Sequence, residues 1–441
     1  MKKQRLLALA LATLLAAFVC LGACDNTASG PSSGAPASNG ASPGTGQAEK
    51  TTIVLWHTYT DQHEEALQKI ADGFNASQDK YTLKLEQQPY SEIDAKMMQA
   101  VRNNTGPDFS TLFPSLAIQY ISEGLLVDFS KYLDDPEIGM PNFKDNIMPG
   151  LYSEVTQWGG GQVYMIPTTT TGEVLFYNKT LFDELNIAPP KTWSDVEAYS
   201  KLIYAEKGIP GFGTDSTIDT YQCLIKQAGS GYIDAASKTM DVDKDIAIDK
   251  LNWFADGVKA GYFRLVGEDM YFSNPFGSGA VASYIGSSAG VSYVYLGVGD
   301  AFEIGCVPIP QEGPVKYISS WAFGYVCFDK KDDTRSKGVY EFLKYFSSPD
   351  VTMDWAEGFG SVPVFLDVLS SERFKAFAQT NVAVGALAEA LPYVGSLSSI
   401  LGANGVRTRL DEMVQSVALG LADAETAYNT FITEANKELN P

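Results

Sequence analysis

Strand-like and helix-like segments alternate along the early part of the chain. The apolar run Thr51–Leu55 leads into Trp56 and His57, and residues 61–75 then carry apolar side chains at helical spacing. The alternating run Tyr81–Leu85 is the next strand. Strands that alternate with helices form a largely parallel sheet covered by helices. The pattern predicts an α/β fold, in which ligands bind beyond the carboxyl ends of the strands.

That rule predicts a binding rim where the first strands end. The side chains at or just after these ends are Trp56, His57, Tyr59, Phe113 and Ser115. An aromatic residue at a strand end fits core packing as well as a binding rim, so both interpretations of Trp56 and Phe113 remain open.

The stretch Gly161–Lys179 has an unusual arrangement. Two strand-length apolar runs, Val163–Ile166 and Val174–Tyr177, flank Pro167 and four consecutive threonines, Thr168, Thr169, Thr170 and Thr171. Proline cannot donate to a sheet ladder, so we expect the chain to change role at this point. Four hydroxyl groups in a row suit an uncharged polar ligand, although an ordinary polar loop between two strands has the same composition.

The N-terminus has the pattern of a secretory signal. Lys2, Lys3 and Arg5 precede the apolar run Leu6–Val19, which is too short to span a bilayer as a stable helix. Residues 1–23 are therefore interpreted as a signal peptide.

The signal ends in LGAC, residues 21–24, which resembles the lipobox of bacterial lipoproteins. The resemblance implies cleavage before Cys24 and a diacylglycerol on its thiol, and a plain signal peptide with a chance cysteine is the alternative. Residues 24–50, rich in glycine, serine, proline and alanine, then form a flexible tether that holds the folded part near a membrane.

The chain is strongly acidic. Its net charge is -21, and removing the three cations of the signal leaves about -24. Nucleic-acid phosphates and anionic lipid surfaces repel such a protein. An anionic ligand remains possible in a locally positive pocket.

Cysteine and histidine are scarce. Of five cysteines, Cys20 belongs to the signal and Cys24 to the anchor, so the remaining three form no complete disulfide framework. With only two histidines and no CxxC pair, the sequence predicts no metal site and no cofactor.

Several motifs occur together and in order along the chain. They are IVLWHTY (53–59), GFN (73–75), GPD (106–108), EGLLVDF (123–129), VYMIP (163–167), LFYNKTLF (175–182), PPKTWSDV (189–196), ASYIGSSAG (282–290) and YFSSPD (345–350). Together they resemble the family 1 extracellular solute-binding proteins of ABC importers, the maltose- and glycerol-phosphate-binding group. The resemblance covers about residues 51–439, and the YNK and PPKTW motifs are its most specific part.

The resemblance implies a two-lobed type II periplasmic-binding-protein fold, with hinged lobes that close on a central ligand cleft. Lobe one would hold residues 51–165 and 321–360, and lobe two would hold residues 166–320 and 361–441. The strand crossings between the lobes would form the floor of the cleft, with the first crossing near Pro167.

The candidate ligand-binding residues follow from the chemistry of sugars. Aromatic faces stack on the apolar faces of sugar rings, while hydroxyls, amides and carboxylates bind the hydroxyl groups. The stacking candidates are Trp56, Tyr59, Tyr90, Trp158 and Trp321. The polar candidates are His57, Asp108, Thr168, Thr169, Thr170, Thr171, Asp215, Ser287, Ser288, Ser319 and Ser320. Core packing or surface capping explains each residue singly about as well.

Arg407 is a further candidate. In glycerol-phosphate-binding relatives an arginine at a similar place reaches the phosphate, and either Arg407 or Arg409 could do so here. Those relatives place tryptophans in the loop that here holds Asp215. An acidic residue there favours a neutral sugar or a cation over a phosphate.

The sequence therefore predicts a non-enzymatic, extracytoplasmic receptor, a monomer anchored by lipid to the bacterial cell membrane, that delivers a sugar to the transmembrane subunits of an ABC permease. The alternative ligand is glycerol-3-phosphate or a glycerophosphodiester. A surface glycosidase, which needs two carboxylates about 5–10 Å apart, and an adhesin or sensor subunit are the competing classes. Fold alone does not separate these classes.

Overall fold

The computed structural model describes residues 49–158, 160–395 and 398–440, without the side chains of residues 320–322. The predicted signal peptide, Cys24 and nearly all of the predicted tether lie outside the described residues. Residues 49–441 form one compact unit. None of the helices described is long and apolar enough to cross a membrane.

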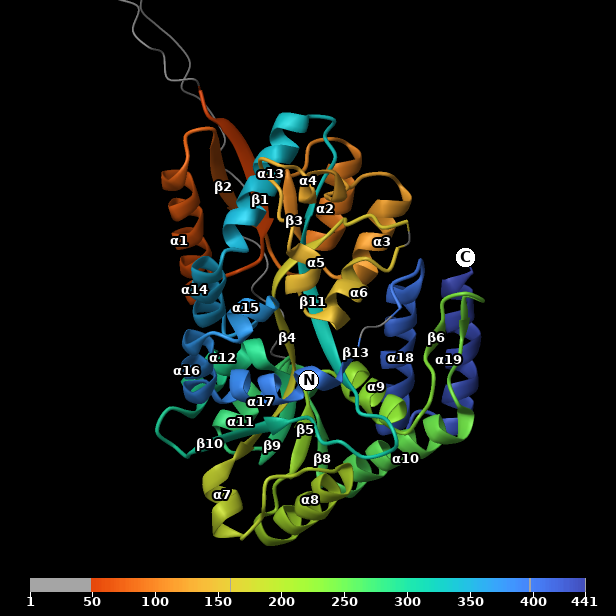
Figure 1. The fold of residues 1–441 in the computed structure, drawn as a ribbon. Helices are drawn as coiled ribbons and strands as arrows, with labels where there is room; N and C mark the ends of the chain where they lie inside the picture. The colour runs from red at the N-terminus through yellow and green to blue at the C-terminus, as the bar shows by residue number, and fades with distance from the viewer. Residues whose placement is uncertain (1–48, 159, 396–397, 441) are drawn as a thin grey trace, which may run out of the picture. The chain divides into compact units, whose positions relative to one another are not determined.

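The main sheet of the described residues runs in the order β2-β1-β3-β11-β4-β9-β5-β8, with β10, β12 and β13 paired to its central strands (Figure 1). Its strands are β1 (Thr51–His57), β2 (Tyr81–Gln87), β3 (Phe109–Leu112), β4 (Ile166–Asn178), β5 (Phe212–Thr214), β8 (Phe263–Leu265), β9 (Ser283–Ser287), β10 (Ile304–Pro308), β11 (Ile318–Cys327), β12 (Val362–Pro363) and β13 (Val394–Gly395). A separate hairpin pairs β6 (Ile233–Asp234) with β7 (Thr239–Met240).

Two groups of parallel strands lie at opposite ends of this sheet. At one end β1 pairs in parallel with β2 and β3, and at the other β5 pairs in parallel with β8 and β9. The long strands β4 and β11 join the two groups through antiparallel pairs. The α/β fold predicted from the alternation is therefore present, but the sheet is mixed rather than largely parallel, because β4 and β11 pair antiparallel with their neighbours.

Strand β4 corrects one prediction. The sequence suggested two strands on either side of a threonine loop, but β4 is a single strand of 13 residues that includes Pro167 and all four threonines. Its first part pairs with β11, whose register shifts between Ala322 and Gly324. Gly324 stands opposite Pro167, so the irregularity falls where proline cannot donate to the ladder.

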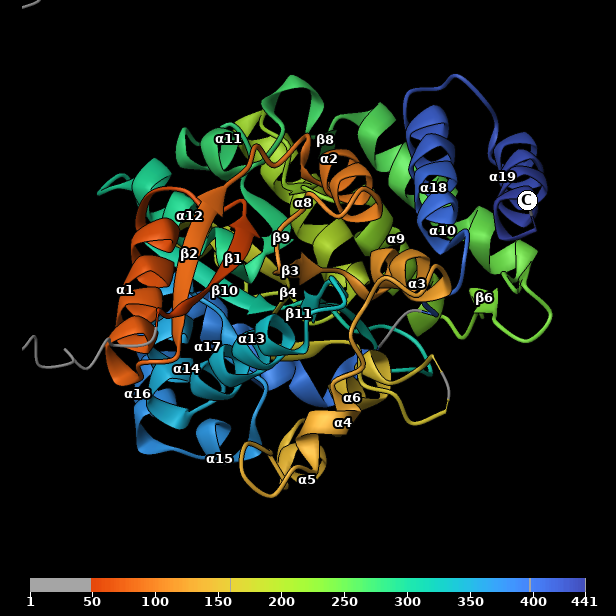
Figure 2. The ribbon, with the colours of Figure 1, turned by 90° about the horizontal axis from the view of Figure 1, so that it is seen from above.

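Helices pack around both strand groups. Helices α1 and α13 contact β2 and β1, α10 contacts β8, and α18 and α19 lie side by side against α10 (Figures 1 and 2). The α-helices are α1 (Asp61–Ser77), α2 (Ile93–Arg102), α3 (Pro114–Ser122), α4 (Ser130–Leu133), α5 (Phe143–Asn146), α6 (Pro149–Val155), α7 (Lys179–Glu184), α8 (Trp193–Lys207), α9 (Thr217–Gln227), α10 (Lys244–Ala260), α11 (Ser273–Gly277), α12 (Val291–Val298), α13 (Asp333–Phe346), α14 (Pro349–Phe359), α15 (Leu366–Leu369), α16 (Glu372–Thr380), α17 (Val382–Ala390), α18 (Ala403–Ala418) and α19 (Ala424–Leu439). Three short 3₁₀ helices are η1 (Gly267–Asp269), η2 (Ser288–Gly290) and η3 (Leu391–Tyr393).

Local capping explains where α8 begins. The Thr192 hydroxyl accepts a hydrogen bond from the Asp195 N–H, and the Asp195 carboxylate accepts one from the Thr192 N–H. This reciprocal capping box satisfies two backbone donors at the start of the helix.

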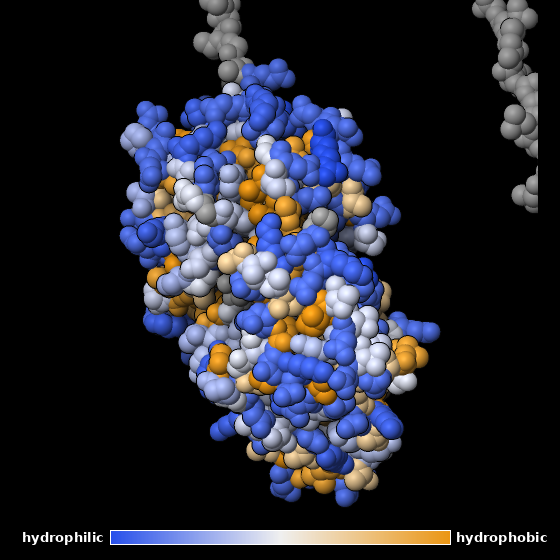
Figure 3. Space-filling model, turned by 90° about the vertical axis from the view of Figure 1, so that its right-hand side faces the viewer, coloured by the Kyte–Doolittle hydropathy of each residue, from blue (hydrophilic) through white to orange (hydrophobic). Residues whose placement is uncertain are grey.

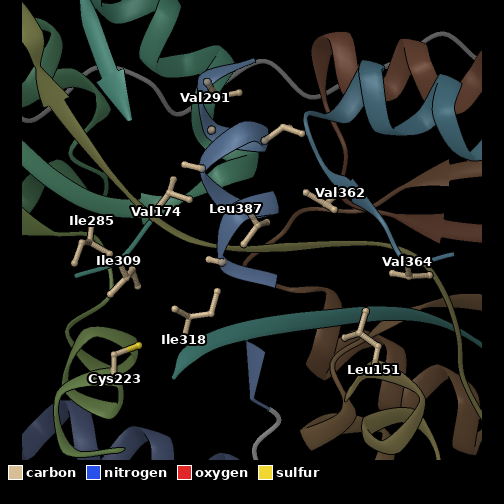
Figure 4. Close-up of a cluster of buried hydrophobic side chains, with 14 of the residues drawn as sticks. Leu151, Val174, Cys223, Ile285, Val291, Ile309, Ile318, Val362, Val364 and Leu387 are labelled. Carbon is tan, nitrogen blue, oxygen red and sulfur yellow. The ribbon is translucent and has the colours of Figure 1, made fainter. Parts of the chain in front are cut away.

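The hydrophobic core is continuous through the strand crossing. Figure 4 shows Leu387 of α17 near Val174 of β4, with Ile318 of β11 and Val362 of β12 in the same cluster. All four side chains are completely buried. The face of the molecule in Figure 3 is mainly hydrophilic, with smaller hydrophobic areas between the polar groups.

Candidate functional site

A cavity of about 1030 Å³ lies against β4 and is lined by elements of both strand groups. Its aromatic lining residues are Tyr59, Tyr90, Phe113, Tyr271, Tyr284, Tyr293, Phe323, Tyr325, Trp355 and Phe359. Its polar and charged lining residues are Thr58, His63, Thr111, Thr168, Thr169, Thr171, Glu173, Asp215, Ser216, Asp219, Ser273, Asn274, Ser287 and Arg407. A volume of this size is typical of sites for small organic molecules.

The cavity brings together several of the residues predicted from the sequence. These are Tyr59, Tyr90, Thr168, Thr169, Thr171, Asp215, Ser287 and Arg407. Of the residues predicted from strand ends, Tyr59 and Phe113, which follow β1 and β3, line the cavity, whereas Trp56, His57 and Ser115 do not. Asp215 and Ser287, proposed for their polar side chains, also lie at strand ends, after β5 and at the end of β9.

Asp108 has a different role from the one expected. Its carboxylate accepts hydrogen bonds from Arg335 Nε and Nη2, each at 2.6 Å, and from the Val54 N–H at 2.7 Å. Lys330 Nζ lies 3.3 Å away. Asp108 precedes β3 and so lies at its amino end, away from the cavity. It holds β1 and α13 together, and the prediction that it binds ligand is corrected.

Other predicted residues also lie outside the cavity lining. Trp56 packs in the core and donates from Nε1 to Glu86 Oε2 at 2.8 Å, and Trp158 packs against Tyr164. His57 is buried beside Tyr59. Burial, the main influence, lowers the pKa of His57.

Three hydroxyls are turned into the protein. Thr170 does not line the cavity, although Thr168, Thr169 and Thr171 do, and its hydroxyl donates to the Thr171 carbonyl at 3.2 Å. Ser288 accepts a hydrogen bond from the Gly172 N–H at 3.4 Å, and Ser319 is buried in β11. The backbones of Ser320 and Trp321 belong to β11, and their side chains lie outside the described residues.

One wall of the cavity is acidic. Asp219, in the first turn of α9, binds Arg407 through two N–O contacts of 3.2 and 3.3 Å, and it also accepts a hydrogen bond from Ser216 Oγ. The Phe272 N–H donates to Asp215 Oδ1 at 2.6 Å. Burial raises the pKa of Asp215 to about 7. Burial and the nearby carboxylates of Asp219 and Asp215 raise the pKa of Glu173 well above its ordinary value, against the effect of Arg407.

Another part of the lining is aromatic. Tyr59 meets Trp355 and Phe359 edge to face, with ring centroids 5.1 and 5.3 Å apart, and Trp355 stacks on Phe359 at 4.9 Å. Tyr90 and Tyr271 line the more open part of the cavity and are 71% and 55% exposed. The cavity therefore combines apolar ring faces with a polar floor.

Sequence reasoning missed important lining residues. Glu173, Asp219, Tyr271, Trp355 and Phe359 were not predicted. Glu173 is the only acidic residue of β4, and a single acid within a buried strand could have marked it as a candidate binding residue. Nothing local marked Trp355 or Phe359, because α14 has an ordinary amphipathic pattern. No cluster of three His, Cys, Asp or Glu residues able to hold a metal occurs in the described parts of the chain.

Comparisons with known proteins agree with this architecture. The family described as bacterial extracellular solute-binding protein matches residues 69–382. The sn-glycerol-3-phosphate-binding periplasmic protein UgpB of Yersinia pseudotuberculosis is 22% identical over 408 residues, covering 87% of this chain and 91% of that protein.

Solved structures show the same fold. The cyclic alpha-maltosyl-1,6-maltose binding protein from Arthrobacter globiformis superposes with a TM-score of 0.76 at 20% identity, covering 88% of this chain and 99% of that one. UgpB from Mycobacterium tuberculosis in complex with glycerophosphocholine gives 0.76 at 17% identity, with 89% and 99% covered. The predicted two-lobed fold is thereby confirmed, while the exact lobe boundaries stay a prediction.

Proposed function

Because the chain belongs to the family of bacterial extracellular solute-binding proteins, the receptors of ABC importers, we propose that its cavity captures a carbohydrate for delivery to a permease. The observation that carries this proposal is the pairing of aromatic ring faces with a floor of threonines and carboxylates around one cavity. Ring faces cover the apolar faces of a sugar, while hydroxyls and carboxylates bind its hydroxyl groups.

The test is a titration of the purified protein with a panel of mono- and oligosaccharides, followed by intrinsic tryptophan fluorescence. Trp355 lines the cavity and provides the signal. We expect a saturable change with at least one saccharide and a smaller change in the Trp355→Phe variant. Saturable binding of sn-glycerol-3-phosphate with no response to any saccharide would contradict the proposal.

Glycerol-3-phosphate is the second candidate ligand because Arg407 lines the cavity. Its guanidinium suits a phosphate, but it already contacts the Asp219 carboxylate. A phosphate would also meet Glu173 and Asp215 on the same wall. Because Arg407 is already paired with Asp219, little positive charge is left for a phosphate, which favours the carbohydrate. If phosphate is the ligand, the Arg407→Met variant should lose binding while the Asp215→Asn variant gains affinity.

We also propose that the cavity carboxylates bind ligand without cleaving it, in keeping with the binding proteins to which the chain is related. Incubation of the protein with chromogenic glycosides should release no chromophore above the buffer rate. Release that disappears in the Glu173→Gln variant would contradict this view.

The proposed lipid anchor is supported by the LGAC sequence that ends at Cys24. Cells expressing the full chain should retain the protein in the membrane fraction, whereas the Cys24→Ser variant should be released. Equal release of both proteins would contradict anchoring. Two acyl chains hold a protein stably where one is marginal.

A further inference from the structure

The acidic wall of the cavity holds more carboxyl groups than cations. Among the described lining residues the carboxylates are Glu173, Asp215 and Asp219, and Arg407 is the only arginine or lysine. Burial lowers the pKa of His63, against the opposing charge of Asp61, so this lining histidine is neutral at pH 7. Arg407 is committed to Asp219 through two contacts.

Glu173 is the clearest unmet acceptor. Its side chain is 96% buried, since only 4% is exposed, and Oε2 accepts no hydrogen bond within the described part of the chain. Glu173 lines the cavity, so its carboxyl group lies at the cavity wall, although Oε2 itself is buried. A buried carboxylate without a partner is costly, so a ligand that satisfies it gains affinity.

Strand β9 lies between Glu173, which is on β4, and Asp215, which follows β5. Glu173 is paired with Ser287 in the sheet, and the Asp215 N–H donates to the Ile285 carbonyl at 2.9 Å. A Cβ atom on Gly286 would lie 2.5 Å from Asp215 Oδ2, so glycine leaves the space that this carboxylate occupies. The backbone therefore accommodates two acids at the cavity wall with Arg407 directed to a third.

A hydroxyl group could hydrogen-bond to one of these acids but would leave both of them without a positive charge to ionise against. A protonated amine supplies several N–H donors together with that positive charge, and charge-assisted hydrogen bonds are about twice as strong as neutral ones. We propose that the ligand is a saccharide carrying a basic nitrogen, whose ammonium group binds Glu173 and Asp215. This inference rests on the proposed carbohydrate-binding function and narrows its substrate class.

Such binding should release protons. The groups that face Glu173 are Asp219 on α9, Asp215 after β5 and Arg407 on α18. Because Arg407 binds Asp219, the acids that can hold protons in the empty cavity are Glu173 and Asp215. An ammonium group that takes their place displaces those protons. A saccharide with only hydroxyl groups leaves them where they are.

The experiment is calorimetric titration at pH 7 with matched pairs of saccharides, glucosamine against glucose and the glucosamine dimer against cellobiose. Each is measured in two buffers that differ in ionisation enthalpy, which yields the number of protons released. We expect the amino member to bind at least tenfold more tightly and to release protons, while the hydroxyl member releases none. The Glu173→Gln and Asp215→Asn variants should lose the preference, and the exposed Glu65→Gln control should keep it.

The outcomes separate the two proposals. If the hydroxyl members bind as tightly as the amino members, or if the two cavity variants keep the preference, the inference is overturned and the carbohydrate function stands. If no saccharide binds and sn-glycerol-3-phosphate does, both are overturned. A thermal melt of each variant verifies folding, and because two separate acids are replaced, one poorly folded variant leaves the other as the test.

Discussion

Two aspartates show how place decides the role of a residue. Asp108 and Asp215 were both predicted to bind ligand. Asp108 lies before a strand and is saturated by Arg335, Lys330 and the Val54 N–H. Asp215 lies after a strand, lines the cavity and accepts a hydrogen bond from the Phe272 N–H. The carboxylate at the amino end of a strand is therefore structural, whereas the one at the carboxyl end is a candidate binding group.

Replacing Asp108 with alanine should destabilise the protein strongly. Removing one member of a buried ion pair leaves the Arg335 charge and the Val54 N–H without a partner, which costs about 3–5 kcal/mol. Urea unfolding followed by circular dichroism measures this loss. The exposed Asp79→Asn variant should unfold with wild-type stability. If the Asp108→Ala variant were equally stable, Asp108 would not have the structural role described.

The threonines of β4 offer a matched comparison at the ligand. Thr169 lines the cavity and its neighbour Thr170 does not. We expect Thr169→Val to weaken saccharide binding by about tenfold, the equivalent of a lost hydrogen bond of about 1.4 kcal/mol, because the methyl group cannot replace the hydroxyl. Thr170→Val should bind normally in the same titration. Equal affinities for both variants would mean that Thr169 does not contact the ligand.

At the scale of elements, β4 connects the two strand groups. It is one strand because β11, β12, β9 and β10 pair with it in turn and satisfy its backbone along its length. The sequence predicted that the strand would be interrupted at Pro167 and the four threonines, but β4 continues through them. Neighbouring strands supplied the hydrogen bonds that an isolated segment would lack.

Helix α17 supports this crossing through Leu387, which is completely buried near β4 (Figure 4). Leu387→Ala should lower the free energy of unfolding by about 2–5 kcal/mol, since the lost packing leaves a cavity. Chemical denaturation checks this value. Leu421 is 77% exposed, and Leu421→Ala should change stability little. Similar small effects for both would argue against tight packing of α17.

At the scale of the whole molecule, buried acids should make stability depend on pH. Burial raises the pKa of Asp215 to about 7 and that of Glu154 to about 8. In the unfolded chain both are ionised above about pH 5. Below the folded values the folded protein therefore binds more protons, so its stability falls as the pH rises toward these values and levels off above them.

The free energy of unfolding should decline from about pH 6.5 to about pH 8 and level off above that, by at most about 1.4 kcal/mol per pH unit for each buried acid. The lowered pKa values of His57 and His63 act below this window. Denaturation across the range measures the slope, and Glu154→Gln should reduce it. A slope that is flat, or unchanged in the variant, would show that Glu154 ionises normally.

Ligand capture should also change the size of the molecule. A receptor whose lobes close on a solute binds it better in the closed state, so saturating ligand shifts the population to a smaller particle. Small-angle scattering with and without the tightest saccharide should show a reduced radius of gyration. Identical values at full saturation would contradict hinge closure.

The sequence by itself determined the α/β class, the family and its role as a solute-binding receptor. These follow from strand–helix alternation and from short motifs, each made of residues that are neighbours in the chain. Strand ends also led to Tyr59 and Phe113, which line the cavity, since parallel strands share an edge. The lobe boundaries and the ligand contacts stay predictions.

Only the tertiary structure decided which acids face the cavity. Glu173, Asp219 and Arg407 lie on β4, α9 and α18, and they meet because the sheet and its helices bring distant segments together. Which way a side chain points depends on strand register and on the partners across the sheet, and one residue of slip reverses it. For that reason Asp108 is held by Arg335 within the protein, while Glu173 presents a carboxylate to the cavity.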